Sequence, residues 1–413
     1  MARENYYTGI DIGSSFVRAV VAQLDQATQT PVVLGIGSAQ MRGMQKGVIT
    51  DVEEAVGSVS RALDMAERIG GLPIERAYIS INGSHISSQN SRGVIAVSRA
   101  DGEITSDDVA RVINAAQAIS LPSNREILHV LPQNFIVDGQ EHIHDPVGMS
   151  GVRLEVETHI IEGSAPFIKN ITKVVNQAGI HVEDFVFSPL AAARAVLEKR
   201  QKELGVVVVD LGAGTTSLAA YEENTLLHTA VLPLGSSHIT NDIAIGLRTS
   251  IDIAESIKVQ HGTAIIEHIK ANESLTIEGE EGNESENISK LEVANIISAR
   301  LEEILAFVDK ELKKINRSGL LPAGVVFTGG GANLPGVIEL AKKRLRLPAR
   351  IGKMPQFRGI TDKTNGPEYG VPYGLVLWAV EQESRATHRS SLQLPNIGHS
   401  VTKLRSWFKT FLP

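Results

Sequence analysis

The stretch GIDIGSSFVRAV at residues 9–20 decides the fold, because the chain repeats its pattern as VVDLGAGTTSLA at residues 208–219. Each copy has an apolar run, an aspartate, a short turn of small residues and a second apolar run. This pattern predicts two strands joined by a tight turn. One such hairpin alone is more typical of an ordinary β-turn, whereas two in register indicate a shared site.

The residues of both turns suit a phosphate group. Glycine lets backbone N–H groups approach phosphate oxygens without a Cβ atom in the way, and hydroxyl side chains add further donors. Two such hairpins facing each other would hold a triphosphate from both sides. The expected contact residues are Gly13, Ser14, Ser15, Gly212, Ala213, Gly214, Thr215 and Thr216.

An aspartate precedes each turn, Asp11 in the first copy and Asp210 in the second. A carboxylate does not bind phosphate directly, because like charges repel. Hard divalent cations, in contrast, take carboxylate and water oxygens as ligands. We therefore expect Asp11, together with Asp210, to hold Mg²⁺ through its water molecules, and we assign no other catalytic group.

Two further motifs accompany the hairpins. The turn TGGGANLPG at residues 328–336 lies between a predicted strand and a predicted helix, where a phosphate or a purine can approach the backbone. Its spacing is not that of a dinucleotide fingerprint, and the chain has no P-loop. Glu255 and Lys258 lie three residues apart on one face of a predicted helix, where a surface ion pair is the plain alternative.

These four motifs, in this order, resemble the superfamily of actin, sugar kinases and heat-shock chaperone ATPases. The resemblance implies an α/β, actin-like two-lobed ATPase fold, with duplicated lobes of a sheet and helices, each carrying a subdomain. It implies ATP and Mg²⁺ in the cleft, with the glycine turn at the adenosine and the Glu-x-x-Lys helix at the ribose and base. The ATP contacts added in this way are Glu255, Lys258, Gly329, Gly330, Gly331 and Asn333.

Longer blocks resemble one family within this superfamily, the bacterial cell-division family FtsA. They are MRGMQKGVITD (41–51), LHVLPQNFIVDG (128–139), DPVGMSGVRLEVETHII (145–161), SIKVQHG (256–262) and VFTGGGANLPG (326–336). The resemblance implies an ATP-binding cytoskeletal adaptor that self-associates, tethers the ring of the tubulin relative FtsZ to the cytoplasmic membrane at the septum, and recruits later division proteins.

The resemblance and the coarse pattern of elements together give the expected domains. Residues 1–82 and 164–200 form the core of lobe one, and 83–163 form an inserted α+β subdomain. Residues 201–383 form lobe two, with its own subdomain at about 236–316. A flexible linker at 384–400 and an amphipathic helix at 401–413 follow.

Composition narrows the function classes. The 413 residues include no cysteine, which excludes disulfides, Cys-ligated zinc and a thiol nucleophile. A net charge of −7 does not suit a general nucleic-acid binder. No apolar run has the length of a membrane span, and the N-terminus has no signal-peptide pattern. We expect a protein of the cytoplasm or of the membrane's cytoplasmic face, with an exposed acidic loop at residues 271–287.

The C-terminal segment VTKLRSWFKTFL (401–412) predicts a short amphipathic helix that lies in a membrane interface. Its apolar face comprises Val401, Leu404, Trp407, Phe408, Phe411 and Leu412, and its flanking cations are Lys403, Arg405 and Lys409. Such a helix is a marginal anchor, so stable attachment needs several tails at once, which self-association supplies.

The family resemblance also implies a site for the acidic C-terminal peptide of FtsZ on the subdomain of lobe two. The matching helix here contains Arg300, which we expect to contact the peptide, and Glu303. Ordinary surface charges three residues apart are the alternative interpretation.

One departure concerns hydrolysis. In relatives that hydrolyse ATP, the helix joining the lobes begins with a Gln or Glu that orients water, and here Ser188 takes that place. A hydroxyl is a poor general base, so we expect at most slow hydrolysis. A small-molecule kinase would need a further carboxylate, and a chaperone would need a large domain after residue 383. A pilus-assembly relative of the same fold would not be expected to carry the basic tail.

Overall fold

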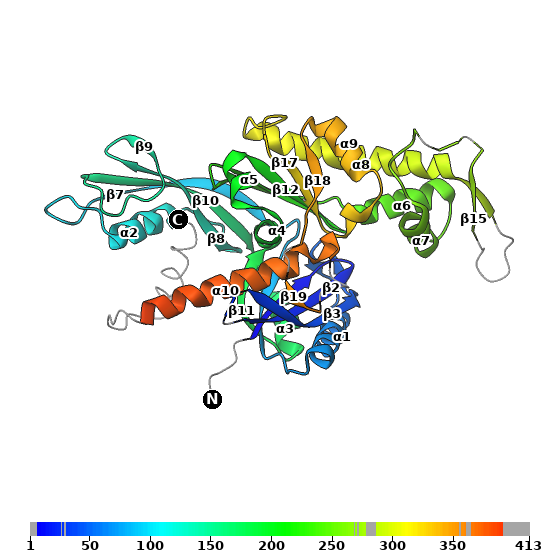
Figure 1. Cartoon of the computed structure of the whole chain (residues 1–413), viewed down its shortest axis with the longest axis horizontal. Helices are drawn as coiled ribbons and strands as arrows, with labels where there is room; N and C mark the ends of the chain where they lie inside the picture. Colours follow the sequence, from blue (N-terminus) through cyan, green and yellow to red (C-terminus); the bar gives the residue numbers. More distant parts are fainter. Residues whose placement is uncertain are drawn as a thin grey trace.

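The computed structural model of the chain describes residues 6–25, 27–28, 30–267, 269–270, 272–277, 286–354, 357–360 and 365–390. Two lobes lie one above the other, and an inserted subdomain extends to one side (Figure 1). The long helix α10 (Gly370–Ser390) runs along lobe one, beneath the inserted subdomain.

Lobe one is built on a sheet with the strand order β11-β6-β1-β2-β3-β19. Three antiparallel strands form one half, and two strands join β1 in parallel on its other side. The bounds are β1 (Tyr6–Ile12), β2 (Phe16–Leu24), β3 (Pro31–Gln40), β6 (Arg76–Ile81), β11 (His181–Phe187) and β19 (Arg358–Gly359).

Lobe two repeats this topology. Its sheet has the order β14-β13-β12-β17-β18, again with three antiparallel strands followed by two parallel ones. The bounds are β12 (Val206–Leu211), β13 (Thr216–Glu222), β14 (Thr225–Leu232), β17 (Gly324–Thr328) and β18 (Ala349–Ile351). The duplicated two-lobed α/β fold is therefore confirmed.

Helices cover both sheets. Helix α1 (Val52–Gly70) begins at Asp51, whose side chain accepts a hydrogen bond from the backbone N–H of Glu54 at 3.0 Å, and it packs against β3. Gly37 of β3 allows this approach, since a Cβ there would lie 1.7 Å from the carbonyl oxygen of Ala62. The other helices of the two cores are α3 (Ala165–Gln177), α4 (Ser188–Val196), α5 (Lys199–Leu204) and α9 (Val337–Leu345).

The inserted subdomain has its own sheet and core. The strand order is β7-β10-β8-β9, and α2 (Ser106–Gln117) packs on β7 and β10. Buried apolar side chains such as Val112, Leu154 and Ile160 fill the space between them. The strands are β7 (Ser87–Ala96), β8 (Arg125–Val137), β9 (Gln140–Ile143) and β10 (Arg153–Ser164).

The subdomain of lobe two corrects one expectation. Its helices are α6 (Ser236–Leu247), α7 (Ile251–His261) and α8 (Lys290–Lys314). The acidic segment 271–287, expected as a loop, instead contributes β15 (Ser274–Ile277) and the start of β16 (Glu286–Ser289), which pair in an antiparallel hairpin. Leu275 and Ile288 face each other in this pair and are buried, and these apolar side chains hold the ends of the segment in place.

Helix α10 continues to Ser390 and so occupies the first part of the segment 384–400 that we expected to be a linker. Residues 391–400 and the expected amphipathic helix at 401–413 lie outside the described residues. Among the described residues, no helix is long and apolar enough to cross a membrane.

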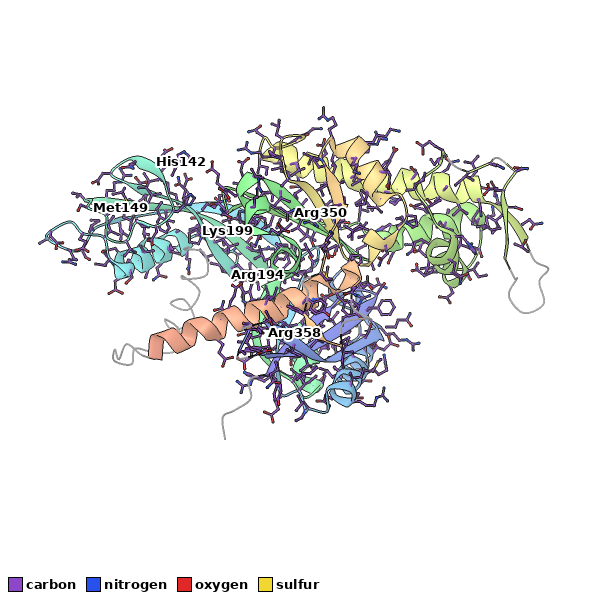
Figure 2. The ribbon with its side chains drawn as sticks, in the orientation of Figure 1. His142, Met149, Arg194, Lys199, Arg350 and Arg358 are labelled. Carbon is purple, nitrogen blue, oxygen red and sulfur yellow. The ribbon has the colours of Figure 1, made fainter. Side chains whose placement is uncertain are left out.

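Glycines allow α10 to lie against the core at two points. A Cβ on Gly374 would lie 1.8 Å from the carbonyl oxygen of Ala191 in α4, and a Cβ on Gly9 would lie 2.6 Å from that of Pro372. Nearby, the guanidinium of Arg194 lies 4.5 Å from the centre of the buried Trp378 ring, at the junction of α4 and α10 (Figure 2). The backbone of α10 therefore packs in direct contact with α4 and with β1 of lobe one.

This packing predicts the effect of a single methyl group. We expect Gly374→Ala to lower the free energy of unfolding by about 1–3 kcal/mol, because the added Cβ overlaps backbone that cannot yield. Thermal unfolding of the purified chain measures it. The matched control is Gly57→Ala in α1, where a Cβ would meet only the flexible end of Arg61 at 3.5 Å. That control should be neutral or stabilising, and equal melting temperatures for both variants would contradict the packing argument.

Candidate functional site

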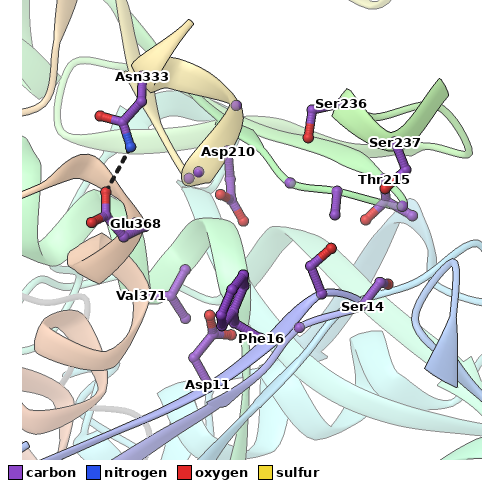
Figure 3. A pocket seen from close by; sticks show the side chains of 18 of the residues that line it. Asp11, Ser14, Phe16, Asp210, Thr215, Ser236, Ser237, Asn333, Glu368 and Val371 are labelled. Atoms are coloured by element: carbon purple, nitrogen blue, oxygen red, sulfur yellow. Dashed lines mark hydrogen bonds between the residues drawn. The ribbon is translucent and has the colours of Figure 1, made fainter. Parts of the chain in front are cut away.

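A cavity of about 360 Å³ lies between the lobes, within the size range of small-molecule sites. Both hairpin turns and the glycine turn contribute to its wall (Figure 3), and helix α7 completes it with Glu255 and Lys258. The sequence-predicted residues that line it are Asp11, Gly13, Ser14, Ser15, Asp210, Gly212, Ala213, Gly214, Thr215, Glu255, Lys258, Gly329, Gly330, Gly331 and Asn333.

The two hairpin turns have the same backbone geometry. The N–H of Gly13 donates to the carbonyl of Phe16 at 3.0 Å, and the N–H of Gly212 donates to that of Thr215 at 3.0 Å. The turns also meet, since a Cβ on Gly214 would lie 2.8 Å from the Oγ atom of Ser14. Glycine is thus required at the point where the lobes approach each other across the cavity.

Thr216 is the one predicted turn residue that does not line the cavity. Its side chain is fully buried, and its hydroxyl donates to the carbonyl of Leu234 at 2.8 Å. Successive side chains of a strand point to opposite faces. Thr215 lines the cavity, whereas the Thr216 hydroxyl points to Leu234, so the structure does not bring Thr216 to the cavity wall.

Asp11 and Asp210 both line the cavity, one from each lobe (Figure 3). The hydroxyl of Ser80 donates to Asp11 at 2.7 Å. Burial, followed by repulsion from Asp11, raises the pKa of Asp210 to about 7, and burial also raises the pKa of Asp11. Gly329 passes so close that a Cβ there would lie 2.4 Å from an Asp210 oxygen.

This arrangement fits a divalent cation. Within the described residues, no group of three or more His, Cys, Asp or Glu side chains could hold a metal by itself. Two desolvated carboxyl groups that repel each other gain from a cation whose other ligands are water and phosphate oxygens. The residues that would hold Mg²⁺ in this way are Asp11 and Asp210.

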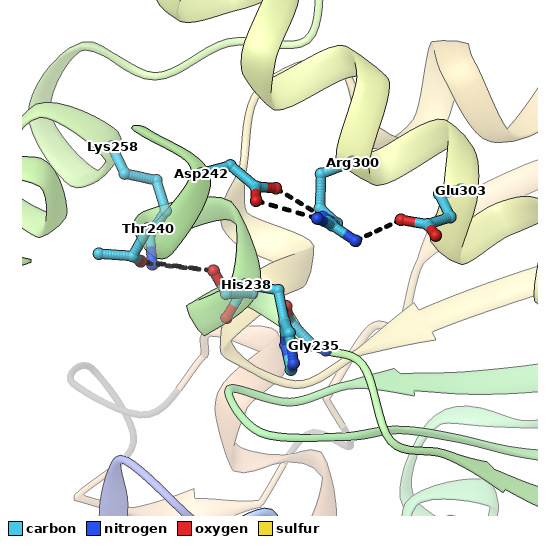
Figure 4. Close-up of polar contacts among 8 residues, drawn as sticks. Gly235, His238, Thr240, Asp242, Lys258, Arg300 and Glu303 are labelled. Carbon is cyan, nitrogen blue, oxygen red and sulfur yellow. Dashed lines mark hydrogen bonds and ion pairs between the residues drawn. The ribbon is translucent and has the colours of Figure 1, made fainter. Parts of the chain in front are cut away.

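Glu255 and Lys258 on α7 are tied to helix α6. The Nζ atom of Lys258 lies 2.6 Å from Glu255 Oε2 and donates to the hydroxyl of Thr240 at 2.8 Å (Figure 4). That hydroxyl in turn donates to Glu255 at 2.5 Å. This network holds both α7 side chains at the wall of the cavity.

The glycine turn is anchored from behind. The N–H of Gly329, at φ +83°, and the hydroxyl of Thr328 both donate to the carbonyl of Pro367, at 2.9 and 2.6 Å. Asn333, at the end of this turn, donates to the carboxylate of Glu368 at 2.9 Å (Figure 3). These hydrogen bonds therefore attach the glycine turn to the segment that leads into α10.

Several cavity-lining residues were not among the predicted site residues. Arg18 carries the clearest sequence signal, because it pairs with Asp11 across the first hairpin and places a cation beside the acidic pair. Its guanidinium lies 5.6 Å from the centre of the Tyr369 ring. Other such residues come from several segments of the chain: Ile12, Phe16, Gly47, Asn82, Ser188, Ser236, Ser237, Ile239, Val259, Leu334, Pro335, Glu368 and Val371.

Arg300 and Glu303 lie outside this cavity, on helix α8. The guanidinium of Arg300 binds both carboxylate oxygens of Asp242 in α6, at 2.5 and 2.9 Å, and it also pairs with Glu303 (Figure 4). Arg300 is 24% exposed and Glu303 is 47% exposed. The expected peptide contact is therefore part of a cluster of three charged side chains.

The raised pKa of Asp210 predicts a pH-dependent stability. Its pKa of about 7 in the folded chain lies above the ordinary aspartate pKa of 3.8, so the folded chain binds the proton more tightly. The stability from this group is present at about pH 4 and is lost as the pH rises through about 7. Asp210→Asn should therefore stabilise the metal-free chain, by a few kcal/mol at about pH 8 and much less at about pH 5.

Thermal unfolding of the metal-free chain at both pH values checks this. The exposed Asp64→Asn is the control, which should follow the unmodified chain. Parallel pH profiles for Asp210→Asn and the unmodified chain would refute the account of the acidic pair.

Comparison with known protein families finds matches over most of this chain. A model of the SHS2 domain inserted in FTSA matches residues 83–162, and a model of cell division protein FtsA matches residues 207–374. Cell division protein FtsA of Pseudomonas aeruginosa is 37% identical over 376 residues, which cover 91% of this chain and 89% of that protein. The Bacillus subtilis protein is 38% identical over 395 residues, 96% of this chain and 88% of that protein.

Solved structures share the fold at low identity. The PilM–PilN type IV pilus biogenesis complex gives a TM-score of 0.68 at 16% identity, covering 91% of this chain and 99% of that one. MreB5 of Spiroplasma citri bound to ADP gives 0.54 at 14% identity, covering 94% and 99%. These likenesses support the actin-like fold alone. The full-length relatives go further, and on their identity and coverage the chain belongs to the FtsA family of bacterial cell-division proteins.

Proposed function

We propose that this chain is an ATP-binding adaptor that self-associates and tethers the FtsZ ring to the cytoplasmic face of the membrane at the septum, recruiting later division proteins. Its membership of the FtsA family supports this role. The observation that carries the nucleotide part is the cavity between two matching hairpins with one aspartate from each lobe.

ATP and Mg²⁺ fit the chemistry of the cavity. The turns offer backbone N–H groups and hydroxyls to the phosphates, the acidic pair suits the cation, and Glu255 and Lys258 lie at the wall for the ribose and base. MreB5 of Spiroplasma citri, which shares the fold, was solved with ADP and with AMPPNP. Bound Mg²⁺ would neutralise the charge of the phosphates and of both aspartates.

Slow hydrolysis is part of the proposal. Ser188 opens α4 at the cavity wall, is almost fully buried, and directs its hydroxyl toward the carbonyl of Ile81 at 3.5 Å. A serine hydroxyl at its normal pKa does not take a proton from water efficiently. ATP then acts as a ligand that holds the lobes together. Among the cavity's other carboxylates, Glu255 and Glu368 already bind neighbouring side chains, so no observation favours a small-molecule kinase.

The cluster of Asp242, Arg300 and Glu303 is the proposed contact for the acidic FtsZ peptide. Asp242 fixes one edge of the guanidinium, and the partly exposed Glu303 occupies another. A guanidinium has five N–H donors. A peptide carboxylate can therefore replace Glu303 while Asp242 keeps Arg300 in position.

The membrane part of the proposal rests on the sequence of residues 401–412, outside the described residues. Six apolar side chains on one face with three flanking cations suit an interface between water and anionic lipid. One tail binds weakly, so attachment depends on self-association.

Co-flotation tests the proposal. Purified FtsZ is mixed with the chain, Mg·ATP and vesicles containing phosphatidylglycerol, and the floated fraction is analysed. The intact chain should float and carry FtsZ, whereas Trp407→Glu should leave both behind. Arg300→Ala should still float, but its affinity for FtsZ should fall at least about tenfold, since loss of a charge-assisted hydrogen bond costs roughly 1.5–3 kcal/mol. Little FtsZ should then float with it.

Lys310→Ala is the matched control, because it removes another exposed cation from α8. It should behave as the intact chain does. An intact chain that floats without FtsZ would overturn the adaptor role, and flotation of Trp407→Glu would overturn the role of the tail.

A further inference from the structure

We propose that Asn82 is a positioning residue that couples the inserted subdomain to closure of the cleft between the lobes. Nucleotide binding then changes the position of the subdomain relative to lobe one. The inference rests on the proposed binding of ATP, and Asn82 was not among the predicted site residues. Asn82 lies directly after β6, at the point where the chain enters the inserted subdomain.

Asn82 reaches across the cleft. It lines the cavity, and its side-chain N–H group donates to the hydroxyl of Ser217 at 2.9 Å. Ser217 lies in β13 of lobe two, directly opposite Asp210 in the hairpin. The carboxamide oxygen of Asn82 accepts a hydrogen bond from the N–H of Gly83 at 2.9 Å, which fixes the first peptide of the inserted subdomain.

The same entry point contacts the turn between β4 (Met44–Gln45) and β5 (Val48–Ile49). A Cβ on Gly47 would lie 2.5 Å from both the carbonyl oxygen of Asn82 and the Cα of Gly83. The N–H of Gly47 donates to the Oγ atom of Ser14 at 3.0 Å. A Cβ on Gly214 would lie 2.9 Å from the Cα of Lys46. This turn therefore lies against both phosphate hairpins and the entry to the subdomain.

The body of the subdomain is fastened to lobe two as well. Ser88 donates to the carbonyl of Thr229 at 2.9 Å, and His159 Nε2 lies 2.8 Å from the hydroxyl of Thr229. Gln133 donates to the carbonyl of Leu226 at 2.7 Å. Both Leu226 and Thr229 belong to β14, which pairs with β13. One hairpin of lobe two thus holds the subdomain at its entry and along its sheet.

Lobe one holds the subdomain from the other side. The backbone N–H of Phe187 in β11 donates to the Nε2 atom of His129 in β8 at 3.0 Å, and the centre of the His129 ring lies 5.7 Å from that of the Trp378 ring in α10. Opening of the cleft moves β13 and β14 away from lobe one. The hydrogen bonds to Ser217 and β14 favour a subdomain that follows lobe two by bending where the chain enters and leaves it. Its position relative to lobe one then changes.

The chain has no cysteine, so dyes can be placed at chosen positions without background. One pair, Val94→Cys with Ile69→Cys, reports the subdomain against lobe one, and a second, Ile245→Cys with Ile69→Cys, reports lobe against lobe. All three side chains are exposed. Energy transfer is measured with and without Mg·ATP, whose binding is followed separately by calorimetry.

We expect Mg·ATP to change the signal of both pairs in the intact chain. The double variant Ser217→Ala, Thr229→Val removes the two lobe-two hydroxyls that bind Asn82 and His159. Neither hydroxyl lines the cavity. It should keep Mg·ATP binding and the lobe signal, and its nucleotide-dependent change of the subdomain signal should be smaller, since only the bonds of Ser88 and Gln133 to backbone carbonyls of β14 remain. Ser298→Ala, a similarly buried serine of α8, is the control and should respond as the intact chain does. Ser217→Ala alone is used if the double variant unfolds.

Three results would overturn the coupling. The subdomain signal could stay constant while the lobe signal changes, the double variant could retain the full response, or Mg·ATP could bind without moving either pair. Absence of Mg·ATP binding in the intact chain would instead refute the proposed function, so the two failures are distinguishable.

Discussion

Asp11 and Asp210 bring two carboxyl groups from separate lobes into one cavity, and burial raises the pKa of both. Ionisation of both side chains opposes close approach of the lobes, and a bound cation, as proposed, would offset that repulsion. The surrounding backbone is fitted to this pair, because Gly329 touches Asp210 where a methyl group would not fit. The closed arrangement of the two hairpins thus depends on how the charge of these aspartates is balanced.

Backbone contacts connect the walls of this cavity to the rest of the molecule. The glycine turn bonds to Pro367, which leads into α10, and α10 touches α4 at Gly374 and the first hairpin strand at Gly9. Helix α4 begins at Ser188 on the cavity wall. Main-chain contacts rather than flexible side chains therefore connect the cavity wall to α10 and α4, and such contacts suit the proposed role of ATP as a conformational ligand.

The sequence predicted the parts of the site that depend on local pattern. Both hairpins, the aspartates and the glycine turn are contiguous motifs, and the duplicated topology followed from the family resemblance. Thr216 does not line the cavity, because the alternation of side chains along a strand decides which way each one points, and the motif does not show where that alternation begins. Asn82 and Glu368 reach the cavity from distant segments, so only tertiary packing reveals them. Gly9 belongs to the hairpin motif, yet its nearest constraint is the packing of α10.

The central claim is that the acidic pair makes nucleotide binding depend on a divalent cation. Calorimetric titration of ATP into the intact chain, with Mg²⁺ and with a chelator, tests it most directly, and the same titration with Asp11→Asn and Asp210→Asn assigns the effect. We expect ATP to bind with Mg²⁺ and to lose most of its affinity without it, while the Asp→Asn variants lose much of this dependence. Equal affinity for ATP in the presence and absence of Mg²⁺ would contradict the account.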